Sequence, residues 1–368
     1  MAKIVILGLT ITSSWGNGHA TTYRALVKAL ARRGHDILFL ERDTPWYREH
    51  RDVTRCPSAK IALYKTLPYL ADRFAGEVAG ADAVIVGSFV PDGIEVGQWA
   101  IRTAKCPVAF YDIDTPVTLA KLQRGECDYL SVELIARFDL YLSFTGGPVL
   151  KLVQQMGSPT AAAFYCSVDP ELHGPVATRR KWEIGYLGTY SPDRQVGLDA
   201  MLLAPARALP AKYFAVAGAQ YPSKITWPGN LLHIEHLPPD QHPDFYCGQR
   251  FTLNITRDDM KALGFSPSVR LFEAAACGVP IISDTWPGLE TIFAVGREIL
   301  VAENTEDVLR ILRNTTPAKR KSIAAAARRR VLSEHTATHR AEHLEHLLDL
   351  CAWQPISCRQ QRRALASP

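Results

Sequence analysis

The sequence predicts an α/β protein built from two doubly wound domains, each with a parallel sheet. The chain has 368 residues, of which 47% are hydrophobic and 21% are charged, and this is enough for two hydrophobic cores. Short apolar strands alternate with helical segments. The alternation begins again after residues 170–181, where prolines, a glycine and several charges indicate a linker.

The first half, residues 1–172, is expected to form one domain. Lys3 to Leu9 is a largely apolar, β-branched run, which is typical of a strand buried on both faces of a parallel sheet. Thr21 to Arg33 places apolar residues at helical spacing, and Gly34 follows as a stop signal. Further strands are expected at residues 37–40, 83–86, 108–111 and 140–144.

The second half, residues 181–316, repeats this pattern. The run EIGYL predicts a strand at residues 183–187, and a helix is expected at 196–208. A second helix, 268–277, ends at a glycine. The basic, alanine-rich stretch 317–353 predicts one or two helices, and the tail 354–368 has no periodicity. The remaining strands are expected at residues 213–217, 231–234, 251–255, 280–283 and 299–301.

Composition excludes several classes of protein. No window approaches the ~18 apolar residues of a spanning helix, and the first nine residues are too short for a signal peptide. The eight cysteines form no CxxC pair, so neither a zinc site nor a disulfide framework is expected. A net charge of +5 without interleaved arginines and aromatic residues does not predict nucleic-acid binding. We therefore expect a soluble, cytoplasmic protein.

The clearest motif is the segment 265–290, FSPSVRLFEAAACGVPIISDTWPGLE. Ser266, Pro267 and Ser268 open a helix, and either serine can cap it. A helix start offers free amides to an anion, and Glu273 lies one to two turns further along, where it can reach ligand hydroxyls. The alternative is a simple cap with a solvated glutamate.

This segment, with EIGYLGTYSPDR before it and GREILVAENTEDVL after it, resembles the nucleotide-binding domain of the group 1 glycosyltransferases, and more narrowly their CgeB-type subgroup. The first half is similar through SSWGNGHATTYRALVKALARRGHDILFLERD, YDIDTPVTLAKL and CSVDP. The resemblance implies the GT-B fold, in which two Rossmann-like domains face a cleft. The second domain binds a nucleotide-diphosphate sugar, the first binds the acceptor, and the last helix crosses back to the first domain.

The resemblance also implies how the sugar donor is recognised. Glu273 matches the glutamate that hydrogen-bonds the ribose, whereas Phe265 stands where many members have a second glutamate that faces the donor sugar. His236 and Leu237 begin the loop where members bind the base through backbone groups. The phenylalanine therefore leaves the sugar and the stereochemical outcome open.

A diphosphate site is expected after the first strand of the second half. Gly188 and Thr189 allow backbone amides to approach a diphosphate closely. Arg194, Arg257 and Lys261 can neutralise its charge, or they can form surface ion pairs with neighbouring aspartates.

A loop in the first half carries a candidate catalytic base. Gly16, Asn17 and Gly18 close the loop before the first helix, and His19 follows them. Their spacing fails as a dinucleotide fingerprint, although Glu41 mimics its ribose acid. His19 is a candidate general base because an imidazole is largely unprotonated near neutral pH. A capping or packing role is the alternative.

Two aspartates in YDIDTP are further catalytic candidates. Asp112 and Asp114 follow a buried strand, and their carboxylates project to the same side if the chain stays extended. They can bind the acceptor or take its proton, although Asp114 can also cap a turn. The same spacing grips a metal in the GT-A fold, but here it lies in the acceptor half. We expect no divalent metal and no cofactor besides the nucleotide sugar.

The C-terminal stretch combines histidines with basic residues. Four histidines at helical spacing can bind zinc in pairs, but nothing completes a ligand shell, so packing or solvation is expected. The basic residues before them can contact an anionic membrane where a lipid-linked acceptor waits, or form a solvated helix face. The histidines are His335, His339, His343 and His346, and the basic residues are Lys319, Arg320, Lys321, Arg328, Arg329 and Arg330.

We therefore expect a hexosyltransferase that moves a sugar from a nucleotide diphosphate, such as UDP, to a hydroxyl acceptor on a glycan, a lipid carrier or a small molecule. The alternatives are an NAD-dependent dehydrogenase, a sugar-nucleotide epimerase and a binding protein without turnover.

Overall fold

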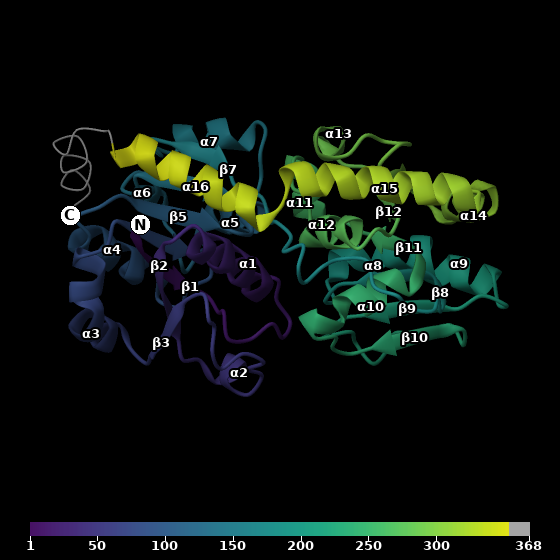
Figure 1. The fold of residues 1–368 in the computed structure, drawn as a ribbon, viewed down its shortest axis with the longest axis horizontal. Helices are drawn as coiled ribbons and strands as arrows, with labels where there is room; N and C mark the ends of the chain where they lie inside the picture. The colour runs from purple at the N-terminus through teal and green to yellow at the C-terminus, as the bar shows by residue number, and fades with distance from the viewer. Residues whose placement is uncertain (353–368) are drawn as a thin grey trace. The chain divides into compact units, whose positions relative to one another are not determined.

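A computed structural model describes residues 1–352, and the expected tail 354–368 lies outside the described residues. The chain divides into two compact units (Figure 1). The first unit contains residues 1–14 and 19–165 and the chain from Ala337 on, and the second contains residues 15–18 and 166–336. The chain therefore passes from the first unit to the second near residue 165 and returns at residue 337.

The first unit has a seven-stranded sheet in the order β3-β2-β1-β4-β5-β6-β7, and all of its strand pairs are parallel. Its strands are β1 (Lys3–Gly8), β2 (Asp36–Arg42), β3 (Lys60–Tyr64), β4 (Ala83–Gly87), β5 (Val108–Asp112), β6 (Leu140–Ser143) and β7 (Ala161–Ala163). Its helices are α1 (His19–Arg32), α2 (Pro45–Arg48), α3 (Leu67–Ala79), α4 (Gly93–Thr103), α5 (Thr115–Arg124), α6 (Val132–Ile135), α7 (Val149–Gln155) and α16 (Ala337–Ala352).

The second unit has a six-stranded parallel sheet in the order β10-β9-β8-β11-β12-β13. Its strands are β8 (Trp182–Leu187), β9 (Phe214–Ala217), β10 (Leu231–Ile234), β11 (Gln249–Asn254), β12 (Ile281–Ser283) and β13 (Leu300–Val301). Its α-helices are α8 (Pro192–Leu198), α9 (Ala204–Ala208), α10 (His242–Cys247), α11 (Asp258–Leu263), α12 (Val269–Ala276), α13 (Leu289–Ile292), α14 (Thr305–Asn314) and α15 (Pro317–Glu334).

The predicted fold class is confirmed by these two doubly wound sheets. The central strands form because their apolar residues are covered on both faces by helices, so that Ile4 to Leu7 are almost fully buried. In place of the single helix expected at 196–208, α8 begins at Pro192, and a π-helical turn at Asp199–Leu203 connects it to α9.

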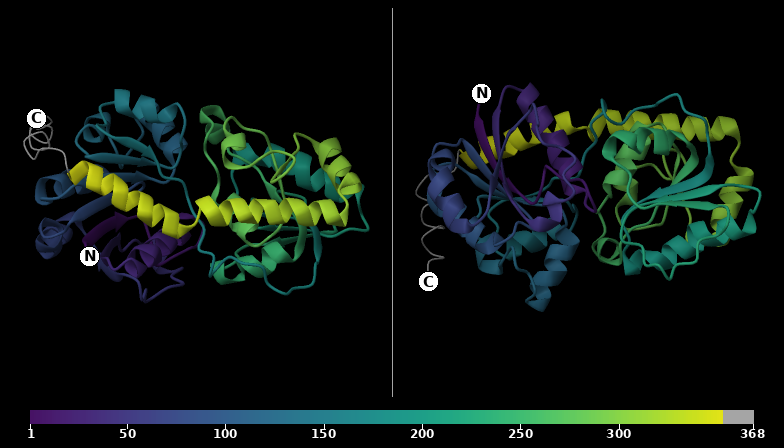
Figure 2. Two further views of the ribbon diagram at one scale, coloured as in Figure 1. Left: turned by 45° about the horizontal axis from the view of Figure 1, so that its top comes forward. Right: turned by 90° about the horizontal axis from the view of Figure 1, so that it is seen from below.

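The C-terminal stretch forms two helices that belong to different units. Figure 2 shows α15 running along the second unit and α16 along the first. Within the first unit, α16 packs against α1, and Glu345 forms ion pairs with Arg33 and His35, both at 2.7 Å. None of the helices within residues 1–352 is long and apolar enough to span a lipid bilayer.

The expectation of one histidine stripe is wrong, because the chain breaks its helix there. α15 ends at Glu334 and α16 begins at Ala337, so His335 lies between the two helices. His335 stacks on Phe272 at a ring-centroid distance of 4.8 Å, whereas His343 packs near Phe164 at 5.9 Å. The stripe is therefore divided between two separate packing environments.

Candidate functional site

In open α/β sheets, ligands bind at the carboxyl ends of the strands where the strand order reverses. In the first unit this point lies between β1 and β4, and Glu41 at the end of β2 organises the loop after β1. The buried Glu41 carboxylate accepts hydrogen bonds from the backbone of Ile11 at 2.7 Å and Thr12 at 3.1 Å. Glu41 therefore fixes the backbone of the loop after β1 through these hydrogen bonds.

His19 begins α1 at this end of the sheet and pairs with Asp114. Nε2 of His19 lies 2.8 Å from Oδ2 of Asp114. The imidazole is buried beside Phe89, with a ring-centroid distance of 5.9 Å. A carboxylate that holds one imidazole nitrogen fixes the tautomer and orientation of the ring. Asp114 therefore orients the imidazole of His19.

The carboxylates of Asp112 and Asp114 were expected to project to the same side, but they point to different surroundings. The chain leaves the extended conformation at Asp114, which precedes α5 with φ −128° and ψ 47°. Asp112 is fully buried, and its carboxylate accepts hydrogen bonds from Tyr141 at 2.5 Å and Thr118 at 2.7 Å. Burial raises the pKa of Asp112 to about 6, although both hydrogen bonds oppose this shift. Asp112 thus supports the core, while Asp114 faces His19.

The loop of Gly16, Asn17 and Gly18 falls with the second unit, whereas the helix that follows it belongs to the first. Gly16 has φ +69°, a conformation that favours glycine. The Asn17 amide donates to the carbonyl of Trp15 at 3.1 Å. The loop is therefore held in a tight turn directly before His19.

In the second unit, Gly188 follows β8 at the point where the strand order reverses. A Cβ atom there would lie 2.6 Å from the Arg270 guanidinium and 2.7 Å from the Tyr186 hydroxyl, so any larger residue would displace one of these two groups. The guanidinium of Arg194, at the start of α8, donates to the carbonyl of Thr189. The arginine and the glycine loop are thus neighbours, as a diphosphate site requires.

The two other predicted basic residues have carboxylate partners. Nε of Arg257 lies 3.8 Å from Oδ2 of Asp193, and the arginine side chain is 38% exposed. Nζ of Lys261 lies 2.8 Å from Oδ2 of Asp284, which is buried. Arg257 therefore keeps access to solvent, whereas Lys261 neutralises a buried carboxylate.

Neither serine caps α12 in the expected way. Ser268 is the N-cap residue, but its side chain makes no capping bond and its hydroxyl donates to Oδ1 of Asn254 at 2.8 Å. The Ser266 hydroxyl donates to the carbonyl of Gly264 at 3.0 Å, and Pro267 separates the two serines. The serine side chains therefore leave the first amides of α12 uncapped.

Arg270 is a buried charge that the sequence analysis missed. Its guanidinium donates to Oδ1 of Asn254 at 2.7 Å and lies 4.5 Å from the centroid of the Tyr186 ring. It also donates to the carbonyl of Leu187, immediately before the glycine loop. Arg270 thus fixes the chain immediately before the glycine loop and adds positive charge beside it.

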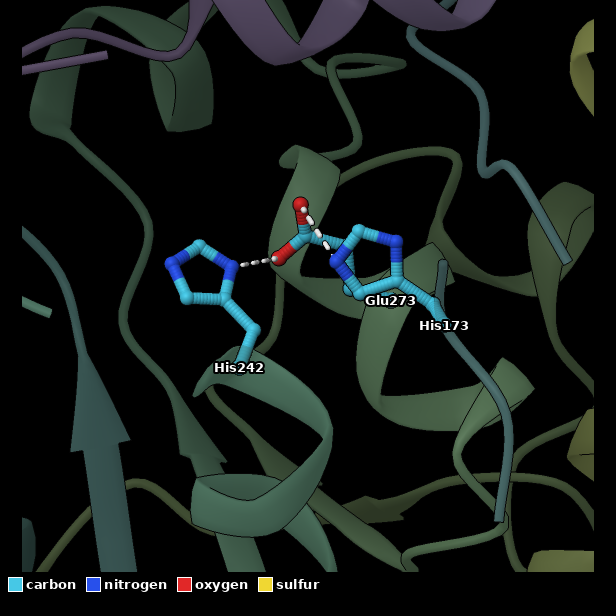
Figure 3. A group of neighbouring side chains, drawn as sticks. All are labelled: His173, His242 and Glu273. Atoms are coloured by element: carbon cyan, nitrogen blue, oxygen red, sulfur yellow. Dashed lines mark ion pairs between the residues drawn. The ribbon is translucent and has the colours of Figure 1, made fainter. Parts of the chain in front are cut away.

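Glu273 is buried between His173 and His242 rather than on a solvated face (Figure 3). Oε2 of Glu273 accepts from the Tyr246 hydroxyl at 2.9 Å, and the carboxylate oxygens lie 3.5 Å from Nε2 of His173 and 3.6 Å from Nδ1 of His242. Burial raises the pKa of Glu273, but the two imidazoles and the tyrosine outweigh it and lower the pKa to about 2. Glu273 is therefore ionised. Among residues 1–352, His173, His242 and Glu273 form the one group arranged to hold a metal ion.

The predicted base-binding loop leads into this cluster. His236 and Leu237 follow β10, and the carbonyl of Leu237 lies 3.2 Å from Nε2 of His242. The loop is thereby tied to the start of α10.

Comparisons with known proteins agree with this geometry. Residues 194–346 match the model of a glycosyl transferase-like family. Solved structures similar to the chain include sucrose-phosphate synthase from Thermosynechococcus elongatus, with a TM-score of 0.68 and 13% identity over 95% of this chain and 99% of that one. HepE from Anabaena, in complex with UDP-glucose, has a TM-score of 0.69 and 13% identity over 95% and 100%. No curated protein sequence matches the chain.

An alpha-glucosyltransferase in complex with UDP and a DNA 13-mer has a TM-score of 0.69 and 12% identity over 95% of this chain and 99% of that one. The chain therefore has the GT-B fold of glycosyltransferases, and residues 194–346, from α8 into α16, are similar to a glycosyl transferase-like family. These findings support sugar transfer from a nucleotide donor and do not favour a dehydrogenase.

Proposed function

We propose that the protein is a hexosyltransferase of the CgeB-type subgroup that uses a UDP-sugar and a hydroxyl acceptor. The observation that carries this proposal is the loop of Gly188, where a side chain would displace Arg270 or Tyr186 and which lies beside Arg194 and Arg270. A glycine loop with two guanidinium groups suits a diphosphate. HepE and the alpha-glucosyltransferase have both been solved in complex with UDP, which supports UDP as the nucleotide of the donor.

The donor half stabilises the leaving diphosphate. Arg194 and Arg257 supply positive charge at the start of α8 and before α11, and the uncapped amides of α12 add a further anion site. Charge grows on the diphosphate as the glycosidic bond breaks, so groups fixed in advance lower the barrier. We therefore propose that the transfer needs no Mg²⁺ or Mn²⁺ on the diphosphate. The base is assigned to the loop of His236 and Leu237. The resemblance matches Glu273 to the ribose glutamate, and this role requires a movement that frees the buried carboxylate from Tyr246.

The acceptor half supplies the base. In a single displacement, the acceptor hydroxyl loses a proton as its oxygen attacks the anomeric carbon. We assign this proton to His19, with Asp114 as the group that orients the ring. Asp112 is not assigned a step, because its carboxylate is buried and bonded to Tyr141 and Thr118.

Isothermal titration with UDP, GDP, TDP and NAD, followed by donor hydrolysis, tests the function. We expect UDP to bind and the UDP-sugar to be hydrolysed slowly. Affinity for NAD alone contradicts the proposal, and nucleotide affinity without hydrolysis or transfer indicates a binding protein. An epimerase converts the donor without an acceptor, and NMR of the product distinguishes this case.

We also propose peripheral contact with anionic membranes through α15. Arg328 donates to the carbonyl of Ala276 at 3.0 Å, and Arg330 pairs with Glu334 at 2.7 Å. Both guanidinium groups therefore already bind partners within the second unit. Lys319, Lys321 and Arg329 are exposed and can face lipid phosphates. Sedimentation with phosphatidylglycerol vesicles tests this contact, which should disappear at high salt and in the variant that replaces these three residues by glutamine.

A further inference from the structure

The cluster of His173, His242 and Glu273 contains polar atoms that protein groups do not satisfy. Nε2 of His173 and Nδ1 of His242, the two ring nitrogens that face Glu273, are buried without a hydrogen-bond partner. A buried polar atom without a partner costs about 1–3 kcal/mol. Two such atoms beside one carboxylate therefore indicate that a further group belongs there.

The tautomer of His242 is set by the carbonyl of Leu237. Nε2 lies 3.2 Å from the Leu237 carbonyl, and a carbonyl can only accept, so this nitrogen carries the proton. In the neutral imidazole, Nδ1 then presents a lone pair to the ionised Oε2 of Glu273, 3.6 Å away. Two acceptors that face each other need either a proton or a metal ion between them.

The distances fit a metal ion better than direct hydrogen bonds. The two imidazole nitrogens lie 3.5 and 3.6 Å from the glutamate oxygens, beyond the usual range for a hydrogen bond. Two ligand atoms about 2.1 Å from a tetrahedral Zn²⁺ lie about 3.4 Å apart. The ligand atoms of all three residues are within 4.8 Å of one another, and the two imidazole rings are 5.9 Å apart (Figure 3).

The surrounding residues have the pattern of an outer ligand shell. A metal-bound imidazole usually donates its other N–H to a carbonyl, and a metal-bound carboxylate is itself hydrogen-bonded. Leu237 and Tyr246 occupy these two positions. We propose that His173, His242 and Glu273 bind a Zn²⁺-class ion that joins the linker after residue 165 to α10 and α12, with a fourth position for water.

This ion is chemically distinct from a diphosphate-bound Mg²⁺, because imidazoles favour zinc and its neighbours over hard cations. The resemblance assigns the ribose to the same glutamate, so the two roles are measured separately. Metal binding is tested without nucleotide, and nucleotide binding is measured by titration calorimetry. If the protein binds no metal ion, the nucleotide titration still tests the proposed function, and if it binds no nucleotide, the metal titration still tests the metal site.

Co²⁺ titration of the full-length, chelator-treated protein tests the site. We expect one equivalent to bind with the strong visible absorption of four-coordinate Co²⁺, and Zn²⁺ to displace it. His173→Asn and His242→Asn should bind at least tenfold more weakly. His346→Asn, which removes an exposed histidine from α16, is the matched control and should bind as the wild type does.

Thermal unfolding supplies a second readout that does not depend on the variants folding. An ion that binds only the folded state raises Tm, so Zn²⁺ should raise the Tm of the wild-type protein and Mg²⁺ should not. The proposal is overturned if the wild type shows neither the absorption band nor the rise in Tm. It is also overturned if folded His173→Asn and His242→Asn bind Co²⁺ as tightly as the wild type.

Discussion

The variant Asp114→Asn tests whether the pair of His19 and Asp114 handles the acceptor's proton. Nε2 of His19 lies 2.8 Å from Oδ2 of Asp114, and a hydrogen bond to a charged group contributes about 1.5–3 kcal/mol. The Asp114 side chain is 34% exposed, so solvent weakens the interaction and the lower end of this range applies. The rate should therefore fall about tenfold, because about 1.4 kcal/mol corresponds to a factor of ten.

Donor hydrolysis, with water as acceptor, is the assay, and it includes His19→Ala and the double variant. His19→Ala should lower turnover by ~10²–10⁴ while donor affinity survives. Because Asp114 acts through His19, the double variant should be as slow as His19→Ala alone. The reasoning is refuted if the two losses multiply, or if Asp114→Asn stays within about twofold of the wild type. Small losses in all variants, with retention of the anomeric configuration, would indicate a reaction without this base.

Three other substitutions and one control substitution give separate readouts. Glu345→Gln should destabilise the first unit by about 1 kcal/mol at neutral pH, measured by urea unfolding. The bond to Arg33 lowers the Glu345 pKa to about 2, so the difference from wild type should vanish as pH falls from about 4.5 towards 2; a pH-independent difference contradicts this. Arg257→Ala should reduce kcat more than donor affinity, while Arg297→Ala, which removes an arginine 75% exposed, should change neither. An equal loss of affinity for donor and diphosphate at unchanged turnover contradicts the Arg257 role. Asp112→Asn should remove a pH dependence of the free energy of unfolding. Burial raises the Asp112 pKa to about 6 from 3.8, so the wild type should lose roughly 3 kcal/mol of stability relative to the variant as the pH rises from about 4 to 6. Parallel stability curves for the two proteins would refute this prediction.

The central strands could be predicted from the sequence because burial on both faces leaves a continuous apolar run, as in β1 and β4. Two edge strands were missed. β3 is only partly buried at most of its positions, and β7 is three alanines without a β-branched residue. An edge strand has one neighbour and less cover, so neither signal is strong.

The candidate site was predictable where a motif is local. His19 and Glu273 stand within recognisable segments, whereas His173 stands in the linker and His242 on a short helix. Their contact with Glu273 arises only when the second sheet forms, so spacing along the chain gives no hint of it. Arg270 was missed for a related reason, because nothing in the sequence of α12 distinguishes it from a solvent-exposed helical arginine. Its guanidinium lies beside the loop because Gly188 has no Cβ atom there.

The return of α16 to the first unit affects the order in which a nascent chain can fold. Domains usually fold as they leave the ribosome, starting from the N-terminus. Here the first unit lacks its last helix until residues 337–352 are synthesised, and Ala341 and Leu344, which are fully buried, have not yet been made. The second unit ends at Thr336 and is complete earlier. A ribosome that stops near residue 336 would therefore release a finished C-terminal unit joined to an unfinished N-terminal one.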